Sequence, residues 1–337
     1  MRIEENVLLS TLTTFRTGGP ARFLLLLDTA DDVPRAVAFA EEKHLPLVPL
    51  GGGSNMLAPD KGVDAVFARF ANGALARTDG EDAYLYSADA GVSWDALVAR
   101  AVEDGAWGIE NLSAIPGTAG AAAVQNIGAY GAAFSDVAEH IEAYDTRTHA
   151  FVTLSAKECR FGYRSSVFKE ERDRFFITRV ALRLPRAPQP NLSYKDLAKR
   201  FAGVSSPTLR DIRESIVAIR AAKFPPLDTY GTAGSFFLNP TVSASDVPAL
   251  RERYPELPLF DLPEGGVKVP LAWFLDRVLE LKGMRKEKAF LWDAQPLVVA
   301  AEEGARAADV RALAEATIAL VKEKIGITVT PEVRILS

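Results

Sequence analysis

A loop of three glycines is the first segment of this sequence whose residue types could do chemistry. After a predicted strand over 45–50, the loop reads Gly51-Gly52-Gly53-Ser54-Asn55. Glycines let the backbone approach a ligand closely and turn several N–H groups inward, an arrangement that suits a pyrophosphate. A plain tight turn explains the same residues. The loop is not a Rossmann fingerprint, because its spacing differs and a strand, not a helix, is expected after it.

A second stretch, 108–131, is rich in glycine and alanine and has few charges. Its small residues over 115–121 lead into a predicted helix, so N–H groups and a helix N-terminus would meet at one point, where phosphates bind well. Close helix packing that merely demands small side chains is the alternative. The polar pair Gln125 and Asn126 favours a ligand, because such groups need partners when they are buried.

Three further segments each carry a side chain that could act on a substrate. Arg164 lies among other cations and aromatic residues in 159–169, where a solvated basic stretch is the alternative. Ser235 follows a glycine where the backbone can bend sharply, and a β-turn entering a strand would explain it too. The segment is not the nucleophile elbow of hydrolases, which requires glycine where Phe237 stands. Glu332 is either an exposed alternating strand position or a buried functional acid.

The composition is that of an ordinary globular chain of 337 residues, 48% apolar and 25% charged, long enough for two or three domains. Its net charge of −5 argues against a general binder of nucleic acid or anionic membranes. The single cysteine, Cys159, allows no intramolecular disulfide and is expected to pack as an apolar residue, which fits a reducing compartment. The three histidines are scattered, so no metal site is predicted. A charged N-terminus without a long apolar run predicts a cytoplasmic protein.

Short strands and helices must position these residues in a mixed α+β pattern. Strands are predicted over 23–27, 45–50, 64–70, 84–88, 141–144, 175–184, 296–301 and 327–335. Helices are predicted over 34–43, from a Ser93 cap to Asp104, from Pro207 through the apolar positions 209, 212, 216 and 219, and over 307–324. Three prolines between 185 and 191 indicate a domain boundary.

Taken in order, these segments resemble the flavin-dependent UDP-N-acetylenolpyruvoylglucosamine reductases, the MurB family. The resemblance begins at Thr14-Phe15-Arg16-Thr17-Gly18-Gly19-Pro20-Ala21 and ends at Pro331-Glu332-Val333-Arg334. It implies an FAD-binding region of the vanillyl-alcohol-oxidase or PCMH type over 1–187, in two α+β subdomains of about 1–70 and 71–187. An α+β substrate-binding domain would occupy 205–326, with the strand at 327–337 returning to the flavin site.

The resemblance also implies the reaction. NADPH would reduce FAD, and the hydride would then pass to C3 of the enolpyruvyl group of a UDP-amino sugar, giving UDP-N-acetylmuramate for peptidoglycan. Arg164 and a protonated Glu332 would stabilise the enolate-like charge, and Ser235 would donate a proton to C2. The expected partners are this sugar nucleotide and NADPH, without nucleic acid or membrane insertion, and the expected state is a monomer.

Binding residues follow from the matching positions. The FAD-binding set is Gly51, Gly52, Gly53, Ser54, Asn55, Ile115, Pro116, Gly117, Gly120, Ala121, Gln125, Asn126, Gly128, Ala129 and Tyr130. Tyr194 resembles the mobile-loop tyrosine of one type within the family and would close over the nucleotide. The remaining positions for phosphate, uracil or the nicotinamide nucleotide are Lys223, Asn239, Lys268, Lys282 and Gln295.

Some positions depart from the family pattern. Leu238 stands where lysine is common, Ser165 replaces a frequent aspartate, and Trp292 lies where histidine is often seen. Ala121-Ala122-Ala123 replaces a more varied run of small residues. These departures concern substrate affinity and nicotinamide preference, and none touches the three catalytic positions.

Two rival functions remain. A flavin oxidase of the same fold would use oxygen, but such enzymes often tether FAD through histidine or cysteine near the glycine loops, and neither occurs between Asn55 and Tyr130. A flavin- or UDP-sugar-binding protein without turnover is the other, against which the joint presence of Arg164, Ser235 and Glu332 counts.

Overall fold

The computed structural model describes residues 1–262 and 265–337, which form two compact units. The first unit comprises Met1–Val7, Ala21–Gly52 and Asp64–Arg220. The second comprises Leu8–Pro20, Gly53–Val63 and Ala221–Ser337. Each unit is therefore assembled from segments that are distant in sequence. The first unit continues through the proline-rich stretch at 185–191 as far as Arg220.

One sheet of the first unit has the strand order β1-β2-β5-β3. The strands are β1 (Arg2–Leu8), β2 (Pro20–Leu27), β5 (Val63–Phe70) and β3 (Leu47–Pro49). Helix α1 (Asp32–Lys43) packs on this sheet, because alternate residues of β2, such as Leu25 and Leu27, and one helix face, including Val33 and Val37, share a buried core. The strand predicted at 23–27 and the helix predicted at 34–43 are confirmed.

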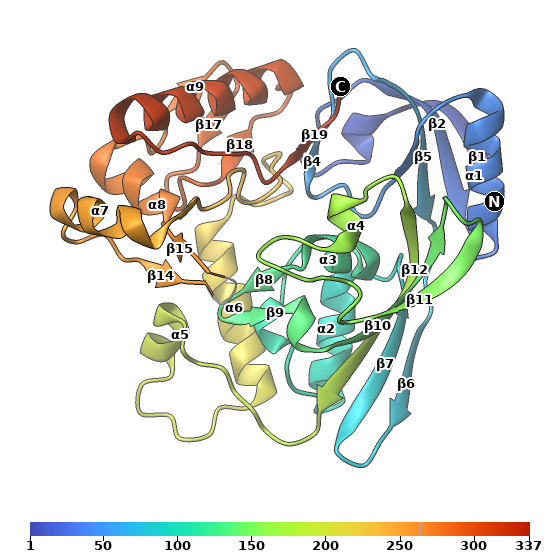
Figure 1. Ribbon diagram of the computed structural model, residues 1–337, viewed down its shortest axis with the longest axis horizontal. Coiled ribbons are helices and arrows are strands. Elements are labelled where there is room, and N and C mark those ends of the chain that lie inside the picture. Colours follow the sequence, from blue (N-terminus) through green and yellow to red (C-terminus); the bar gives the residue numbers. More distant parts are fainter. Residues whose placement is uncertain (263–264) are drawn as a thin grey trace. The chain divides into compact units, whose positions relative to one another are not determined.

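The second sheet of this unit is antiparallel, with the order β11-β10-β12-β7-β6. Its strands are β11 (Ala150–Ser155), β10 (Ala138–Asp145), β12 (Phe175–Pro185), β7 (Ala83–Asp89) and β6 (Leu75–Asp79). Helices α2 (Trp94–Glu103), α3 (Ala119–Gln125) and α4 (Val167–Glu170) contribute to its core (Figure 1). Three alanines of α3 are buried there, which explains why this helix is so poor in large side chains.

The predicted cap of α2 is wrong in one detail. Ser93 precedes Trp94, but its side chain makes no capping hydrogen bond to any residue that the structure describes. The Trp94 N–H instead donates to the carbonyl oxygen of Gly117 at 3.1 Å, so the glycine-rich segment itself satisfies the start of the helix. The predicted end is confirmed, because Gly105 has a φ of 77° just after the helix.

Helix α6 (Leu209–Lys223) begins two residues after the predicted start at Pro207. Thr208 and Asp211 decide the position: the Thr208 Oγ1 accepts from the Asp211 N–H at 3.2 Å, and the Asp211 Oδ2 accepts from the Thr208 N–H at 2.9 Å. This reciprocal pair is a capping box. The buried face of α6 shares a small core with α5 (Lys195–Arg200), through Leu197, and with Tyr130.

The second unit contains small sheets covered by helices. Its strands are β13 (Thr241–Val242), β15 (Val267–Lys268), β14 (Phe260–Asp261), β16 (Arg285–Lys286), β17 (Ala289–Leu291), β18 (Val299–Ala301), β4 (Met56–Leu57) and β19 (Arg334–Ile335). Its helices are α7 (Val247–Arg253), α8 (Leu271–Trp273), the π-helical turn η5 (Phe274–Val278) and α9 (Ala307–Ile325). Helix α9 lies on the β16-β17-β18 sheet (Figure 1).

The C-terminal strand is shorter than predicted. Only Arg334–Ile335, the strand β19, is extended in a ladder, and it pairs in parallel with β4 of the same unit (Figure 1). Within the rest of the predicted strand at 327–335, Pro331 forms an isolated bridge with Phe237. No helix among the described residues is long and apolar enough to cross a membrane.

Candidate functional site

The two glycine-rich segments of the first unit lie against each other. A Cβ atom at Gly51 would stand 2.9 Å from the Thr118 Oγ1 and 3.0 Å from the Ala121 Cβ. One at Gly52 would stand 3.0 Å from the Gly117 Cα. These distances are too short for side chains, so glycine is required by the close approach of the two loops. Each segment was an anion-binding candidate by its residues, the resemblance assigned both to one FAD, and the structure brings their backbones together.

Four peptide N–H groups at this contact have no protein acceptor among the residues that the structure describes. They belong to Gly51, Gly52, Gly117 and Thr118, all of them half-buried. Buried and half-buried N–H groups normally find partners, and successive N–H groups in a concave loop bind anions. The residues present therefore fit a pyrophosphate, which is the group that FAD would bring.

The first turn of α3 offers fewer N–H groups to a phosphate than the sequence predicted. The N–H of Ala119 donates to the Val92 oxygen at 2.8 Å, and that of Gly120 donates to the Ala90 oxygen at 3.0 Å. The Ala121 N–H reaches the capping Thr118 side chain at 3.4 Å. Since these groups already have protein partners, the N–H groups of the loops, rather than the first turn of the helix, are the ones available to a phosphate.

Arg164 is joined to the second glycine-rich segment in the first unit. Its Nη2 donates to the Gly128 oxygen at 2.6 Å, and its own backbone oxygen accepts from the Lys169 Nζ at 2.8 Å. The same Lys169 Nζ donates to the Gln125 Oε1 at 3.1 Å. The Asn126 side chain donates to the Gly162 oxygen at 2.9 Å. The segment 159–169 and the predicted flavin-binding residues Gln125, Asn126 and Gly128 thus form one hydrogen-bonded cluster.

Ser235 follows a bend in the second unit. Gly234 has a φ of 73°, and its N–H donates to the Thr232 Oγ1 at 3.1 Å. The Thr232 hydroxyl in turn donates to the Val299 oxygen at 2.8 Å, which ties the turn to β18. Ser235 then pairs with Val298 in an isolated bridge. The segment is therefore a bend that leads into an isolated backbone pairing, and the catalytic role of Ser235 stays a prediction.

The backbone of Glu332 lies beside the segment that carries Ser235 in the second unit. The Glu332 N–H donates to the Phe236 oxygen at 2.8 Å, directly after Ser235. The Asn55 Nδ2 donates to the Glu332 oxygen at 3.3 Å, and the Arg334 N–H donates to the Asn55 oxygen at 3.1 Å. The structure therefore brings Ser235, Glu332 and Asn55 together, whereas Arg164 belongs to the first unit.

The predicted substrate residues of the second unit fall into separate places. The segment at Asn239 lies beside Lys268, because the Val269 N–H donates to the Pro240 oxygen at 2.8 Å. The Asn239 Oδ1 accepts from the Leu271 N–H at 3.0 Å, which fixes the amide.

Lys282 is exposed and forms an ion pair with Asp276 at 2.8 Å. Gln295 lies in the turn before β18, two residues from Leu297, whose oxygen accepts from the Phe236 N–H at 2.7 Å. Gln295 is therefore near the Ser235 segment in this unit. Lys223 is the last residue of α6.

Tyr194 and Tyr130 meet in the first unit. Their ring centroids are 5.0 Å apart at an interplanar angle of 78°, an edge-to-face contact. The Tyr194 side chain is 43% exposed, whereas Tyr130 is buried. A predicted cofactor residue and the predicted mobile-loop residue are thus in direct contact.

Arg220 is a residue that the sequence analysis missed. Its Nε donates to the Ala114 oxygen at 3.2 Å, and it also hydrogen-bonds the Tyr130 hydroxyl. Desolvation lowers the pKa of Arg220, against the opposing effect of Tyr130. A signal was present, because Arg220 lies four residues after Ile216 on the apolar face of α6, where a cation needs a reason to be.

Three of the departures have structural partners. Ser165 Oγ donates to the Glu170 Oε1 at 3.0 Å, and the Leu238 N–H donates to the Thr330 oxygen at 3.0 Å. Trp292 packs edge-to-face on Tyr230 with centroids 5.4 Å apart. The Ser165 and Trp292 side chains thus have local partners, whereas the hydrogen bond at Leu238 is made by the backbone and does not explain the leucine.

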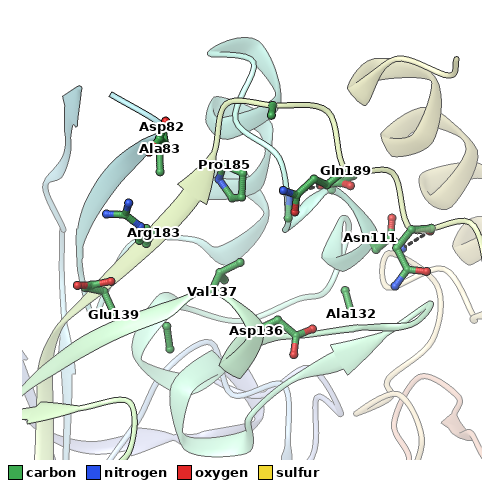
Figure 2. Close-up of a pocket in the computed structure, with 15 residues that line it drawn as sticks. Asp82, Ala83, Asn111, Ala132, Asp136, Val137, Glu139, Arg183, Pro185 and Gln189 are labelled. Carbon is green, nitrogen blue, oxygen red and sulfur yellow. Dashed lines mark hydrogen bonds between the residues drawn. The ribbon is translucent and has the colours of Figure 1, made fainter. Parts of the chain in front are cut away.

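Cys159 is fully buried, as predicted, and burial raises the pKa of its thiol to about 12. Such a thiol is a poor nucleophile at neutral pH. A cavity of about 560 Å³ in the first unit is lined by none of the predicted site residues; Asn111, Gln189 and Arg183 are among those that line it (Figure 2). No group of three or more His, Cys, Asp or Glu side chains within 1–262 and 265–337 could hold a metal ion.

Comparisons with known proteins agree with this arrangement. Residues 21–149 match a family model described as an FAD binding domain, and residues 225–336 match one described as the C-terminal domain of UDP-N-acetylenolpyruvoylglucosamine reductase. A reductase of that name from Pseudomonas aeruginosa is 39% identical over 335 residues, covering 98% of both chains. One from Chromobacterium violaceum is 40% identical over 341 residues, covering 100% of this chain and 99% of its own.

A solved structure supports the fold. The crystal structure of UDP-N-acetylenolpyruvylglucosamine reductase (MurB) from Thermus caldophilus is 24% identical, covers 100% of both chains and superposes with a TM-score of 0.69. The predicted fold class, an α+β chain with an FAD-binding region and a further α+β domain, is confirmed. With relatives about two-fifths identical over essentially its whole length, this chain belongs to the UDP-N-acetylenolpyruvoylglucosamine reductase family.

Proposed function

We propose that this protein is an FAD-dependent oxidoreductase that uses NADPH to reduce the enolpyruvyl group of UDP-N-acetyl-3-O-(1-carboxyvinyl)-glucosamine to UDP-N-acetylmuramate. The observation that carries the proposal is the setting of Ser235. A bend at Gly234 precedes Ser235, and the next residue, Phe236, accepts a backbone hydrogen bond from Glu332, in a chain that belongs to a reductase family. A proton donor and a carboxyl group so placed suit the protonation of a carbanion beside a carboxylate.

FAD, when bound, supplies the acceptor and donor of a hydride. The N–H groups of Gly51, Gly52, Gly117 and Thr118 would hold its pyrophosphate. The rest of the FAD-binding set would surround the cofactor, and the hydrogen bond that joins Arg164 to Gly128 supports a role of this segment near the reacting groups.

Arg164 and Glu332 would stabilise the negative charge that develops on the substrate when C3 receives a hydride. The charge spreads from C2 into the neighbouring carboxylate, so a guanidinium and a carboxyl group are suited to it. Ser235 would then transfer its hydroxyl proton to C2. A serine hydroxyl is a weak acid, but an enolate is a base strong enough to take its proton.

Tyr194 would close over the nucleotide of the substrate, and its exposed ring beside Tyr130 supports this role. Polar and basic residues would contact phosphate, uracil or the nicotinamide nucleotide; they are Lys223, Asn239, Lys268, Lys282 and Gln295. The assignment of FAD binding to 1–187, with subdomains at about 1–70 and 71–187, belongs to this proposal. So does substrate binding by 205–326, with 327–337 returning to the flavin.

The proposal extends to the setting of the enzyme: a monomer that works in the cytoplasm. A buried single thiol and the absence of a possible intramolecular disulfide support a reducing compartment. Light scattering of the purified protein tests the monomer, because a dimer would give twice the mass of 36.5 kDa.

An anaerobic spectrum tests the reaction. The purified protein should show flavin absorption that bleaches with NADPH and recovers when the UDP-enolpyruvyl sugar is added. Bleaching without recovery would support a flavin reductase but would refute the UDP-enolpyruvyl sugar as its substrate. A protein that takes up no FAD in reconstitution would refute the proposal, and rapid reoxidation by oxygen without turnover of the sugar would indicate an oxidase.

A further inference from the structure

A buried asparagine, Asn111, joins two segments of the first unit, one at Tyr130 and one at Asn191, which lie 19 and 80 residues after it. The Asn111 Nδ2 donates to the Tyr130 oxygen and to the Asn191 oxygen, both at 2.8 Å. Only 1% of Asn111 is exposed. Both amide hydrogens are thus used on backbone carbonyls, one beside each of the segments that carry Tyr130 and Tyr194.

Asn191 continues the connection. Its Nδ2 donates to the Gly131 oxygen at 2.8 Å, and its Oδ1 accepts from the N–H and the hydroxyl of Ser193 at 3.2 and 2.7 Å. A Cβ at Gly131 would lie 3.0 Å from the Asn191 Nδ2, so the two segments are in close contact. We call Asn111 and Asn191 the asparagine clasp.

The asparagine clasp holds the backbone that leads into Tyr194. Tyr194 is three residues after Asn191 and directly after Ser193, and its ring lies against Tyr130 at 5.0 Å. Tyr130 has a φ of 49°, an uncommon backbone conformation for a residue with a side chain. The hydrogen bond from Asn111 to its carbonyl helps to hold that conformation.

Stability alone does not account for Asn111. Its Oδ1 is buried and has no hydrogen-bond partner within the described residues. A buried polar atom without a partner costs free energy, and such exceptions need an explanation. Placing two separate carbonyls with one rigid amide is such an explanation, because among uncharged side chains only an amide donates two hydrogen bonds from one nitrogen.

We propose that Asn111 is a positioning residue, which sets the base of the Tyr194 segment against the Tyr130 backbone and thereby acts on UDP-sugar binding through Tyr194. The inference rests on the proposed function, since it requires Tyr194 to contact the substrate. Gln189 lines the same cavity as Asn111 and Asn191 but is not part of the asparagine clasp (Figure 2). It therefore provides a matched control.

Steady-state kinetics of the FAD-loaded enzyme at saturating NADPH test the proposal. Asn111→Asp keeps the volume but turns a carboxylate toward two carbonyl oxygens, and Asn191→Ala removes the second half of the clasp. Each should raise the KM for the UDP-enolpyruvyl sugar by about tenfold, the loss expected for one or two hydrogen bonds, with kcat changed less than about twofold. Gln189→Ala should keep the KM of the wild type.

A double-mutant cycle decides whether the asparagine clasp acts through Tyr194. Tyr194→Ala alone should raise the KM at least about fivefold, and adding Asn111→Asp or Asn191→Ala should then change it by less than about twofold. Hydrogen exchange of residues 188–200 should be faster in both clasp variants and unchanged in Gln189→Ala.

The outcomes are separable. If Tyr194→Ala raises the KM and the clasp variants do not, the role of Asn111 is refuted while the proposed function stands. The same holds if the KM increase of the double variant equals the product of the increases of Tyr194→Ala and of the clasp variant. If Tyr194→Ala leaves the KM unchanged, the assignment of Tyr194 fails, and the action of the clasp on the substrate fails with it. Should Asn111→Asp not fold, Asn191→Ala carries the same test.

Discussion

Ser235 owes its position to a short network of backbone and hydroxyl groups rather than to a neighbouring base. The bend at Gly234 is held by Thr232, and the segment after it pairs with Val298 and Glu332 through the backbone. Because this network uses no atom of the Ser235 hydroxyl, removing that hydroxyl should leave the local fold intact. A substitution of Ser235 can therefore test the part of its hydroxyl in the reaction without changing the local fold.

Ser235→Ala should leave the reduction of the flavin by NADPH within about twofold of the wild type. It should slow reoxidation by the UDP-sugar by about a hundredfold or more, because the proton donor is lost. Stopped-flow absorbance under anaerobic conditions measures both steps. Ser245→Ala, an exposed serine of the same unit, is the control. Equal losses in both half-reactions would show that Ser235 is structural.

Glu332→Gln should slow only the second half-reaction, by about tenfold or more. The substitution keeps the shape and the backbone hydrogen bonds to Phe236 and Asn55 but removes the carboxyl group from the developing charge. The same stopped-flow assay measures the effect, with the exposed Glu323→Gln as the control. Turnover at the wild-type rate would show that the Glu332 carboxyl group takes no part in the reaction.

The sequence allowed more to be predicted about residue types than about partners. The triple glycine at 51–53 indicated a close backbone approach, and the approach to Gly117 is observed. The partner could not be predicted, because it lies more than 60 residues away and no local rule links the two loops. Asn111 was missed for the same reason, because its spacing does not distinguish it and its partner Asn191 lies 80 residues away.

At the level of elements, the long periodic segments were predicted, whereas some ends, such as the start of α6, were not. Helix α9 and the strand β12 follow clear apolar patterns, and both are found within one or two residues of prediction. Their ends depend on side chains that sequence alone does not bring together. The capping box of Thr208 and Asp211 fixes the start of α6 at Leu209, two residues after the predicted start at Pro207.

Helix α9 shows how far such a partner can be in the sequence. The Asp60 Oδ1 accepts from the Ala307 N–H at 2.7 Å, and the Oδ2 accepts from the Ala308 N–H at 3.0 Å. A carboxylate that binds the first N–H groups of a helix acts as its cap and complements its dipole. Asp60 thus ties the segment Gly53–Val63 to the C-terminal part of the second unit.

Asp60→Ala should lower the free energy of unfolding by about 1 kcal/mol, the usual loss for a helix cap. Urea denaturation followed by circular dichroism measures it as a shift of the midpoint without a change of slope. Asp60→Asn keeps one acceptor oxygen and should lose less. If Asp60→Ala is as stable as the wild type, the two hydrogen bonds do not stabilise α9.

For the whole molecule, the discontinuous units are the feature that the sequence did not predict. The patterns suggested consecutive regions, but Leu8–Pro20 and Gly53–Val63 belong to the same unit as the C-terminal residues. Short segments without strong periodicity carry no information on which core they join. Gly231 illustrates the reason, since a Cβ there would stand 2.1 Å from the Phe15 oxygen, a contact between residues more than 200 positions apart.

Acid stability is a further property of the whole molecule that follows from charges in the structure. Hydrogen bonds from Arg174 at 3.0 and 2.8 Å hold the pKa of the buried Asp145 below its ordinary value. A carboxyl group whose pKa is lower in the folded state stabilises that state above its unfolded pKa, about 3.9, and the contribution is lost as the pH falls through the folded value. The protein should therefore lose stability progressively below about pH 4.

Asp145→Asn should reduce the free energy of unfolding at pH 7 and flatten its decrease between about pH 4 and pH 2, because the asparagine takes up no proton. Arg174→Gln should flatten the same range, since it removes the group that lowers the pKa of Asp145. Urea denaturation at half-unit pH intervals measures both slopes. If both variants keep the wild-type slope below pH 4, acid lability comes from other carboxylates, such as Asp32 or Asp104, whose pKa values are also lowered against the opposing effect of burial.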